Sequence, residues 1–279
     1  MTCQFLLYNV SLEFDRKDIS TVPIKKPRLY PARLDTVFRY SSGVNAISFD
    51  EQTIKNLTNL GLLWGFLKYH HPAVAKGNYN WDAELFRILP EVLADENNTA
   101  ANKAMEMWVD RIGKPAKCTK CIVIKKDVSI KLMPDYGNLF KEGNLSHSLI
   151  TKLQYILQNR TSDIKYYVKL DYYGRPEFKN EELYPEMLYP DAGYRLLGLY
   201  RYWNIIKYFY PYRHLIGEDW NKVLADFVPK FLQAKDTLAY ALSCSEMITR
   251  IHDSHAGILP NRTIGDVLGR YLSPVQTRF

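Results

Sequence analysis

The sequence predicts a mainly α-helical fold: a helical bundle built from two similar helical units, with a short N-terminal β element and a small α+β insert. Three observations support this prediction. A block of the chain repeats at a constant offset of 139 residues. Apolar side chains in both copies recur at steps of three and four, which is the period of an amphipathic helix. Hydrophobic residues make up 47% of the 279 residues, which suffices for a buried core.

The N-terminal segment, residues 1–50, is predicted to hold a strand and a linker, as the end of a truncated β domain. Apolar and polar residues alternate strictly from Tyr8 to Phe14, which is typical of a half-buried strand. No strand precedes this segment as a partner. The proline-bounded stretch Pro23–Pro31 indicates a linker rather than the return strand of a hairpin.

The C-terminal segment, residues 261–279, is predicted to be a linker and the start of a missing domain. Its last residues, Pro274–Phe279, begin a second alternating pattern and stop. A lone strand leaves its backbone groups unpaired, so we expect the chain to be a piece of a longer protein. The alternative is that the two terminal strands pair with each other or with a strand near Lys165–Leu170.

The repeat defines helical unit 1 (residues 51–112) and helical unit 2 (residues 191–260). The matched residues include two tryptophans and two prolines per copy, which chance rarely places at equal spacing. The pairs are Trp64 and Trp203, Lys68 and Lys207, Tyr69 and Tyr208, Pro72 and Pro211, Trp81 and Trp220, Leu85 and Leu224, Pro90 and Pro229, and Leu93 and Leu232.

Each helical unit is predicted to contain three helices in the same order. In unit 2 the first helix ends at Pro211, and Asp219 is the expected N-cap of the second, which ends before Pro229. The third begins at Asp236-Thr237. The corresponding helices of unit 1 are expected around Leu57–Leu67, Trp81–Leu89 and Ala100–Ile112.

Between the units lies the insert, residues 113–190. Short β-prone runs occur at Ile122–Ile124 and Tyr166–Val168, and a helix is expected over Ser148–Gln158 with Ser146 or Ser148 as its N-cap. The abundant tyrosines of the insert are expected to pack it on the bundle rather than to stack nucleic-acid bases.

Charge and hydropathy exclude several classes of function. The net charge is +7, but lysines and arginines are scattered, so we expect no nucleic-acid partner. No segment approaches the roughly 18 apolar residues of a membrane span. The N-terminus also lacks the pattern of a signal peptide, which indicates a cytoplasmic chain or a missing true start.

Two motifs suggest metal or thiol chemistry. Cys118 and Cys121 form a C-x-x-C pair without the further ligands of a zinc site, which leaves open a structural thiol pair or loop disulfide, a metal bound with distant histidines, and redox chemistry. His70-His71 ends a predicted helix where unit 2 has aromatic residues, so we interpret these imidazoles as packing or capping groups. No metal and no cofactor is predicted.

The segment Arg250–Ile258 holds the candidate catalytic residues, Ser254 and His255. His255 lies four residues after Ile251 and is expected to continue the apolar stripe of the third helix to its end. Asp253 and Ser254 are close enough in sequence to hydrogen-bond the His255 ring, as a general base requires. The alternative is a histidine that only stabilises the helix C-terminus.

Three blocks of the sequence, with Asp253-Ser254-His255, resemble bacterial peptidases of the tail-specific (C-terminal processing) and tricorn-core serine peptidase family. The blocks are Leu62–Pro72, Asn80–Asp82 and Tyr194–Pro211. The resemblance runs from Asp35 to Phe279 and corresponds to the helical region before the PDZ-like and peptidase domains. It implies a periplasmic or cell-envelope location for the full-length protein.

The resemblance also implies a function. Tricorn-type members carry a Ser-His pair here, with the histidine as base for a serine far downstream, and Ser254-His255 match that pair. The tail-specific branch uses a Ser/Lys dyad instead, and this chain contains no G-x-S-x-G motif. We therefore expect a non-catalytic N-terminal portion of a serine endopeptidase, with the downstream domains and a peptide or protein substrate as partners. The alternative is an α-helical peptide- or protein-binding module.

Overall fold

The computed structural model describes residues 13–14, 17–18, 29–94, 97–119, 121, 135–160, 166–258 and 262–268. Contacts divide the chain into an N-terminal part, residues 1–30, and a helical body, residues 31–279. In the N-terminal part, β1 (Glu13–Phe14) pairs antiparallel with β2 (Lys17–Asp18). The end of the predicted strand therefore has a hairpin partner, contrary to our expectation. The rest of that strand, like the segment 274–279, lies outside the described residues.

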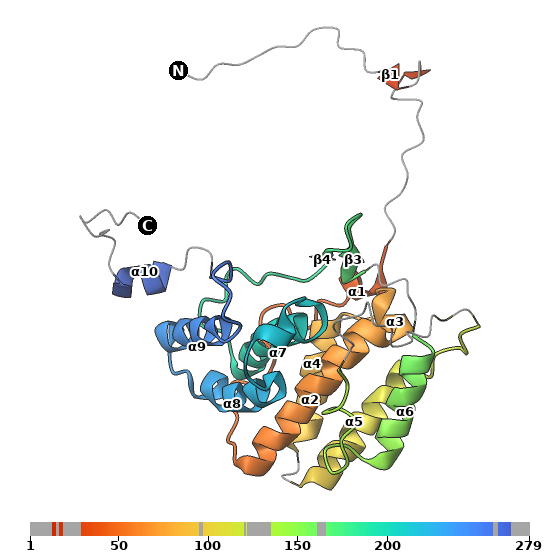
Figure 1. Ribbon diagram of the computed structural model, residues 1–279, viewed down its shortest axis with the longest axis horizontal. Coiled ribbons are helices and arrows are strands. Elements are labelled where there is room, and N and C mark those ends of the chain that lie inside the picture. The colour runs from red at the N-terminus through yellow and green to blue at the C-terminus, as the bar shows by residue number, and fades with distance from the viewer. Residues whose placement is uncertain are drawn as a thin grey trace. The chain divides into compact units, whose positions relative to one another are not determined.

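The helical body is mainly α-helical, as predicted, and its only described sheet is a two-stranded antiparallel hairpin. In chain order the elements are α1 (Pro31–Leu34), α2 (Glu51–His70), α3 (Pro72–Ala75), α4 (Trp81–Leu93), α5 (Asn98–Ile112), α6 (His147–Gln158), β3 (Val168–Leu170), β4 (Pro176–Phe178), α7 (Ala192–Phe209), the 3₁₀ helix η2 (Arg213–Leu215), α8 (Trp220–Gln233), α9 (Thr237–Thr249) and α10 (Arg262–Leu268). Figure 1 shows α5 and α6 on one side of α2, and α7, α8 and α9 on the other.

The two helical units contain the same helices at the same offset. The helices α2, α4 and α5 of unit 1 correspond to α7, α8 and α9 of unit 2. The N-caps of α4 and α8, Asn80 and Asp219, share backbone angles of φ −71° and ψ 104°, and each side chain accepts a backbone N–H of its helix. The side chains of Asn97 and Asp236 likewise accept a backbone N–H at the starts of α5 and α9.

A pair of tryptophans joins the first two helices of each unit. In unit 1 the indole N–H of Trp64 donates to the carbonyl of Trp81 at 3.0 Å, and Trp81 donates to the carbonyl of Trp64 at 2.9 Å. Trp203 and Trp220 exchange the same two bonds, at 2.6 and 3.1 Å. All four indoles are buried, so each N–H needs its partner. This shared motif explains why the sequence repeats these residues.

The first helices of the two units, α2 and α7, meet along equivalent positions. Gly61 lies against its counterpart Tyr200, and Gly65 against its counterpart Asn204. One turn further, the rings of Tyr69 and its counterpart Tyr208 pack edge to face at 5.4 Å. Because these contacts advance in the same direction along α2 and α7, the two helices run parallel. Equivalent residues face each other, as they would about a pseudo-twofold axis. Such contacts between equivalent positions are typical of symmetric dimers.

One expectation about helix ends is wrong. Pro229 does not follow α8 but lies inside it, and Pro90 lies inside α4. Both prolines occur near the end of their helix, where the burial of later residues such as Phe231 outweighs one lost backbone bond. Residues 31–50 belong to the helical body and contact it through side chains. Ser42 donates to the Asp191 carboxylate from its backbone and its side chain.

The insert packs on the helical body through α6 and buried tyrosines. Ser146 is the N-cap of α6, as one of the two predicted candidates. Tyr166 and Tyr167 precede β3 and are buried, as expected. In contrast, Tyr172 and Tyr173 are exposed at the turn between β3 and β4. The predicted β-prone run 122–124 lies outside the described residues.

Candidate functional site

The backbone after α9 brings the candidate residues out of the bundle. Arg250 is held by an ion pair with Glu218, and Ile251 is buried. The next residue, His252, has a left-handed φ of 53°, which is uncommon for a residue other than glycine. The helix therefore ends before His255, and the prediction that His255 continues its apolar stripe is wrong. The left-handed residue turns the chain away from the helix axis.

Asp253 holds the ring of His255. Its Oδ1 accepts the backbone N–H of His255 at 2.9 Å and lies 3.1 Å from the ring Nδ1. The His255 side chain is otherwise 94% exposed. A proton on Nδ1 satisfies this hydrogen bond and leaves Nε2 with a free lone pair facing solvent. This is the arrangement that a general base needs.

The second oxygen of Asp253 is bound from another helix. The hydroxyl of Tyr210, the C-cap residue of α7, donates to Asp253 Oδ2 at 3.2 Å. The pKa of Asp253 is lowered first by the backbone N–H of His255 and then by the His255 ring. The pKa of Tyr210 is raised by burial and by its bond to Asp253, so the hydroxyl stays protonated as a donor. Asp253 therefore has bonded partners at both oxygens.

The structure brings together only part of the predicted set. Ser254 is exposed, and among the described residues no hydrogen bond joins it to His255. Asp253 supplies the ring contact instead. Sequence reasoning missed Tyr210, which is 43 residues away from Asp253. The 139-residue offset contained the signal, because Tyr210 corresponds to His71, and the His71 ring bonds Gly113 at the end of α5 in unit 1.

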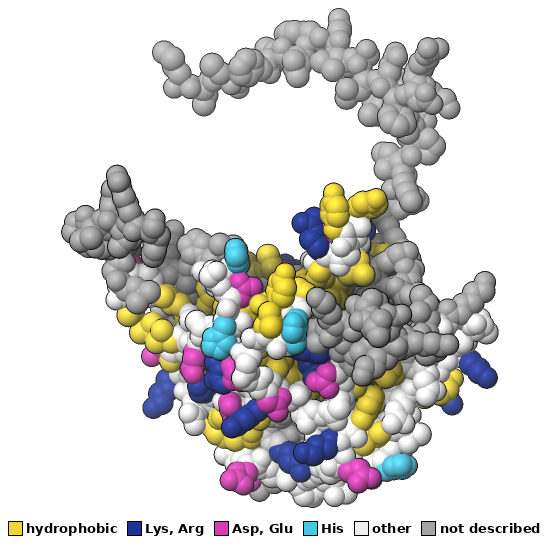
Figure 2. All heavy atoms as spheres, in the orientation of Figure 1, with side chains coloured by type: hydrophobic (Ala, Val, Ile, Leu, Met, Phe, Trp, Pro, Cys, Tyr) yellow, Lys and Arg dark blue, Asp and Glu magenta, His cyan; other side chains and the backbone are white. Residues whose placement is uncertain are grey.

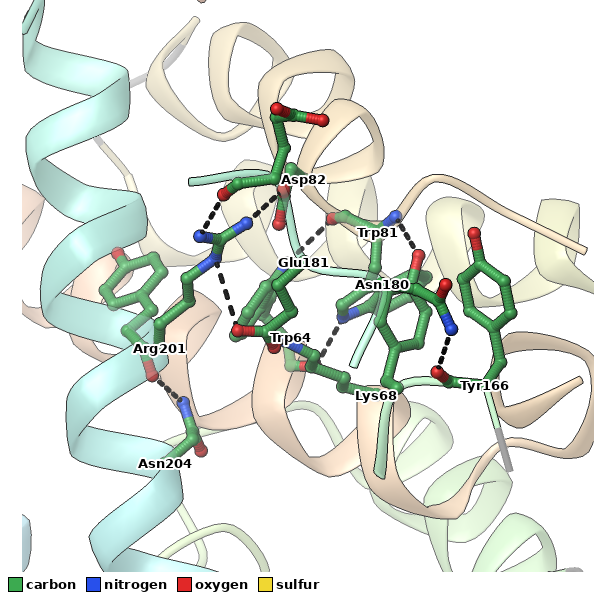
Figure 3. Close-up of polar contacts among 12 residues, drawn as sticks. Trp64, Lys68, Trp81, Asp82, Tyr166, Asn180, Glu181, Arg201 and Asn204 are labelled. Carbon is green, nitrogen blue, oxygen red and sulfur yellow. Dashed lines mark hydrogen bonds and ion pairs between the residues drawn. The ribbon is translucent and has the colours of Figure 1, made fainter. Parts of the chain in front are cut away.

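A second polar cluster lies inside the helical body (Figure 3). Arg201 pairs with Asp82, and its Nε lies 4.0 Å from Glu181, which in turn pairs with Lys68. The Lys68 side chain is fully buried, and burial lowers its pKa in spite of the Glu181 carboxylate. With each charge matched by an opposite one, this cluster is a structural ion network.

A cavity of about 360 Å³ lies beside this network. Four of its charged lining groups already have partners: Asp35 binds Arg87, Arg33 binds Asn180, and Asp82 and Glu181 belong to the network. In the part of the chain that the structure describes, no group of three or more His, Cys, Asp or Glu side chains gathers as a metal site would require.

The remaining motifs have structural roles. Cys118 and Cys121 form a disulfide, which agrees with one of the three interpretations. His70 is buried with Nδ1 2.8 Å from the Phe66 carbonyl and Nε2 2.9 Å from the Tyr136 hydroxyl. Burial lowers its pKa to about 4, so the ring is neutral. The His71 ring accepts the backbone N–H of Ala73 and caps α3. The predicted role at the end of the helix is confirmed for His70, whereas the His71 ring caps the start of α3 instead.

Comparisons with known proteins add no relative: no family model, curated protein or solved structure matches this chain. Figure 2 shows acidic and basic side chains interspersed over the visible face of the described part, without a continuous basic patch. None of the described helices is long and apolar enough to cross a membrane.

Proposed function

We propose that this chain is the non-catalytic N-terminal portion of a serine endopeptidase, and that it supplies the general base His255 to a peptidase domain. The observation that carries the proposal is the Asp253–His255 pair. A carboxylate holds Nδ1, and the exposed ring presents Nε2 outward. The resemblance to tricorn-core peptidases supplies the reaction class.

The proposed chemistry is acyl transfer from a peptide. A serine hydroxyl of the downstream domain attacks the peptide carbonyl while Nε2 of His255 accepts the hydroxyl proton. The imidazolium then gives that proton to the leaving amine as the C–N bond breaks. Asp253 stabilises the positive ring in between, and backbone N–H groups of the downstream domain bind the oxyanion. Ser254 is the neighbouring hydroxyl of the matched Ser-His pair.

The competing idea of a pure binding module has less support. Such a module would bind its partner in a groove lined by tyrosine and tryptophan, with His255 enclosed. The tryptophans Trp64, Trp81, Trp203 and Trp220 are instead buried and bonded to one another's backbone. His255 faces solvent.

The experiment measures peptide hydrolysis by the protein extended through the coding sequence that follows Phe279. We expect His255→Ala to lower kcat by several orders of magnitude with the fold intact, because removing a base from a nucleophile pair has that effect. The 279-residue chain alone should not react with a fluorophosphonate probe. A loss of less than about tenfold, or about 1.4 kcal/mol of barrier, would refute the base role and favour a Ser/Lys dyad. Absence of any peptidase sequence after Phe279 would favour the binding module.

A further inference from the structure

In each helical unit a side-chain hydrogen bond, here called the tie, joins the C-cap residue of the first helix to the segment after the third helix. The group that this side chain contacts differs between the two units. In unit 1 the C-cap residue of α2, His71, reaches the end of α5 and bonds the carbonyl of Gly113 at 2.8 Å. In unit 2 the equivalent C-cap residue, Tyr210, reaches the end of α9. The tie is therefore part of the common frame, and it links the first helix of each unit to the segment after the third.

The difference is the group at the far end of the tie. His71 binds a backbone carbonyl, which fixes only the chain path. Tyr210 binds the carboxylate of Asp253, whose other oxygen contacts the His255 ring. A bond to a side chain fixes a rotamer. The tie in unit 2 thus orients a titratable pair, whereas the tie in unit 1 holds a loop.

The residue just before Asp253 also differs from its counterpart in unit 1. Gly113 and its counterpart His252 both have positive φ, at 96° and 53°. Unit 1 has a glycine at this position, for which a positive φ costs little, while unit 2 has a histidine and accepts the strain. Strained residues of this kind are concentrated at functional sites. A residue with a Cβ also restricts the backbone that carries Asp253 more than glycine would.

We propose that Tyr210 is a positioning residue for His255, acting through Asp253. Its hydroxyl fixes the rotation of the carboxylate, so that Oδ1 stays against Nδ1 and the ring keeps its proton there. Nε2 then remains the proton acceptor. The tie itself is independent of the proposed peptidase function; only its consequence for catalysis rests on that function.

Two neighbouring tyrosines provide context for this role. Tyr202 has a buried hydroxyl without a hydrogen-bond partner among the described residues, and its pKa is raised to about 12 by burial and then by Tyr210 and Asp253. Tyr212 packs its ring on Tyr210 at 6.0 Å, but none of the hydrogen bonds of the described residues engages its hydroxyl. Tyr212→Phe is thus a matched control for loss of a hydroxyl.

The test is the tautomer of His255 in the 279-residue chain, measured by long-range ¹H–¹⁵N NMR at a pH where the ring is neutral. We expect the ratio of Nδ1–H to Nε2–H to fall about threefold in Tyr210→Phe and about tenfold in Asp253→Asn, since these variants remove one hydrogen bond and the charged acceptor respectively. Tyr212→Phe should match the wild type. An unchanged ratio in a folded Tyr210→Phe variant would overturn the proposal.

A second measurement does not depend on the Tyr210 variant. The pKa of Tyr210, followed through its ring carbon signals, should be lower in Asp253→Asn than in the wild type, because the Asp253 carboxylate raises it. An unchanged Tyr210 titration would show that the tie does not exist in solution. In the extended protein, Tyr210→Phe should lower kcat several-fold with KM unchanged. If His255→Ala leaves turnover intact while the tautomer shifts occur, the base role of His255 fails and the tie stands.

Discussion

Helical unit 1 and helical unit 2 share a frame and differ at their ends. Both have the same N-cap positions, reciprocal tryptophan bonds and helix order. After the third helix, however, unit 1 continues with Gly113-Lys114-Pro115-Ala116, while unit 2 has His252-Asp253-Ser254-His255 at the same positions. The residues that repeat in both units therefore maintain the fold. The candidate site lies where the two sequences differ. Unit 1 is an internal reference for which features of unit 2 are structural.

The ion pairs with the insert are a second difference between the units. The insert supplies one carboxylate to each unit, and these two carboxylates differ in their exposure to water. The equivalent lysines Lys68 and Lys207 both lie in the body with buried side chains. Lys68 pairs with Glu181, which is 14% exposed, and Lys207 pairs with Asp135, which is 43% exposed. The same lysine position is thus an internal ion pair in unit 1 and a pair open to water in unit 2.

The largest effect should come from these lysines. We expect Lys68→Met to lower the free energy of unfolding by about 3 to 5 kcal/mol, because Glu181 loses its nearest cation inside the protein. Lys207→Met should cost only about 1 kcal/mol, since Asp135 keeps its water. Urea unfolding followed by tryptophan fluorescence measures both values. Equal losses in the two variants would contradict the assigned difference between the units.

The next largest effect is a loss of unfolding free energy at acid pH, which we expect from a buried histidine of unit 1. His70 has a pKa of about 4 in the folded chain, against 6.5 as its ordinary value, and its counterpart in unit 2 is Phe209. Below pH 6.5 the unfolded chain binds the extra proton, so stability falls as the pH drops from 6.5 to 4. The total loss from this one ring is about 3 kcal/mol.

The check on this acid sensitivity compares unfolding free energies at pH 7.5 and pH 4.5. His70→Phe should have the smaller difference between these two pH values, while His147→Gln, at an exposed histidine, should reproduce the wild-type difference. A His70→Phe profile that overlays the wild type would place the acid sensitivity elsewhere, for example at His71, whose pKa is also lowered by burial.

The pseudo-twofold contact between α2 and α7 gives a smaller effect. A Cβ at Gly65 would lie 1.8 Å from Asn204 Oδ1, and the Asn204 amide already donates to two backbone carbonyls. Gly65→Ala should therefore cost about 2 kcal/mol. The double variant Gly65→Ala/Asn204→Ala removes the clash, so its cost should fall below the sum of the single costs by about 1 kcal/mol. Additive costs in this double-mutant cycle would argue against direct contact.

Local signals predicted much of the frame from the sequence. The polar N-caps Ser146 and Asp219 and the repeated tryptophans stand close in sequence to the helices they organise. The partners of the buried charges gave no such signal: Glu181 is 113 residues from Lys68. The continuation of α8 beyond Pro229 also depends on the burial of its last residues in the body rather than on local helix propensity. For the site, Asp253 was visible as a neighbour of His255, whereas Tyr210 comes near only through folding.

The smallest effect concerns the residue that begins the difference between the units. Gly113 has φ 96° and ψ 155°, a conformation open almost only to glycine, so Gly113→Ala should cost about 2 kcal/mol. His252 has φ 53°, a region that a residue with a Cβ enters at a cost of about 1–2 kcal/mol. His252→Gly relieves this strain but adds freedom to the unfolded chain, so we expect a gain of only about 0.5 kcal/mol. In the folded chain, the glycine backbone should also let Asp253 change its position more easily. This should lower the Nδ1–H population of His255, as measured by NMR. A stabilised variant with an unchanged tautomer would show that the strain at His252 serves the chain path and not the Asp253–His255 pair.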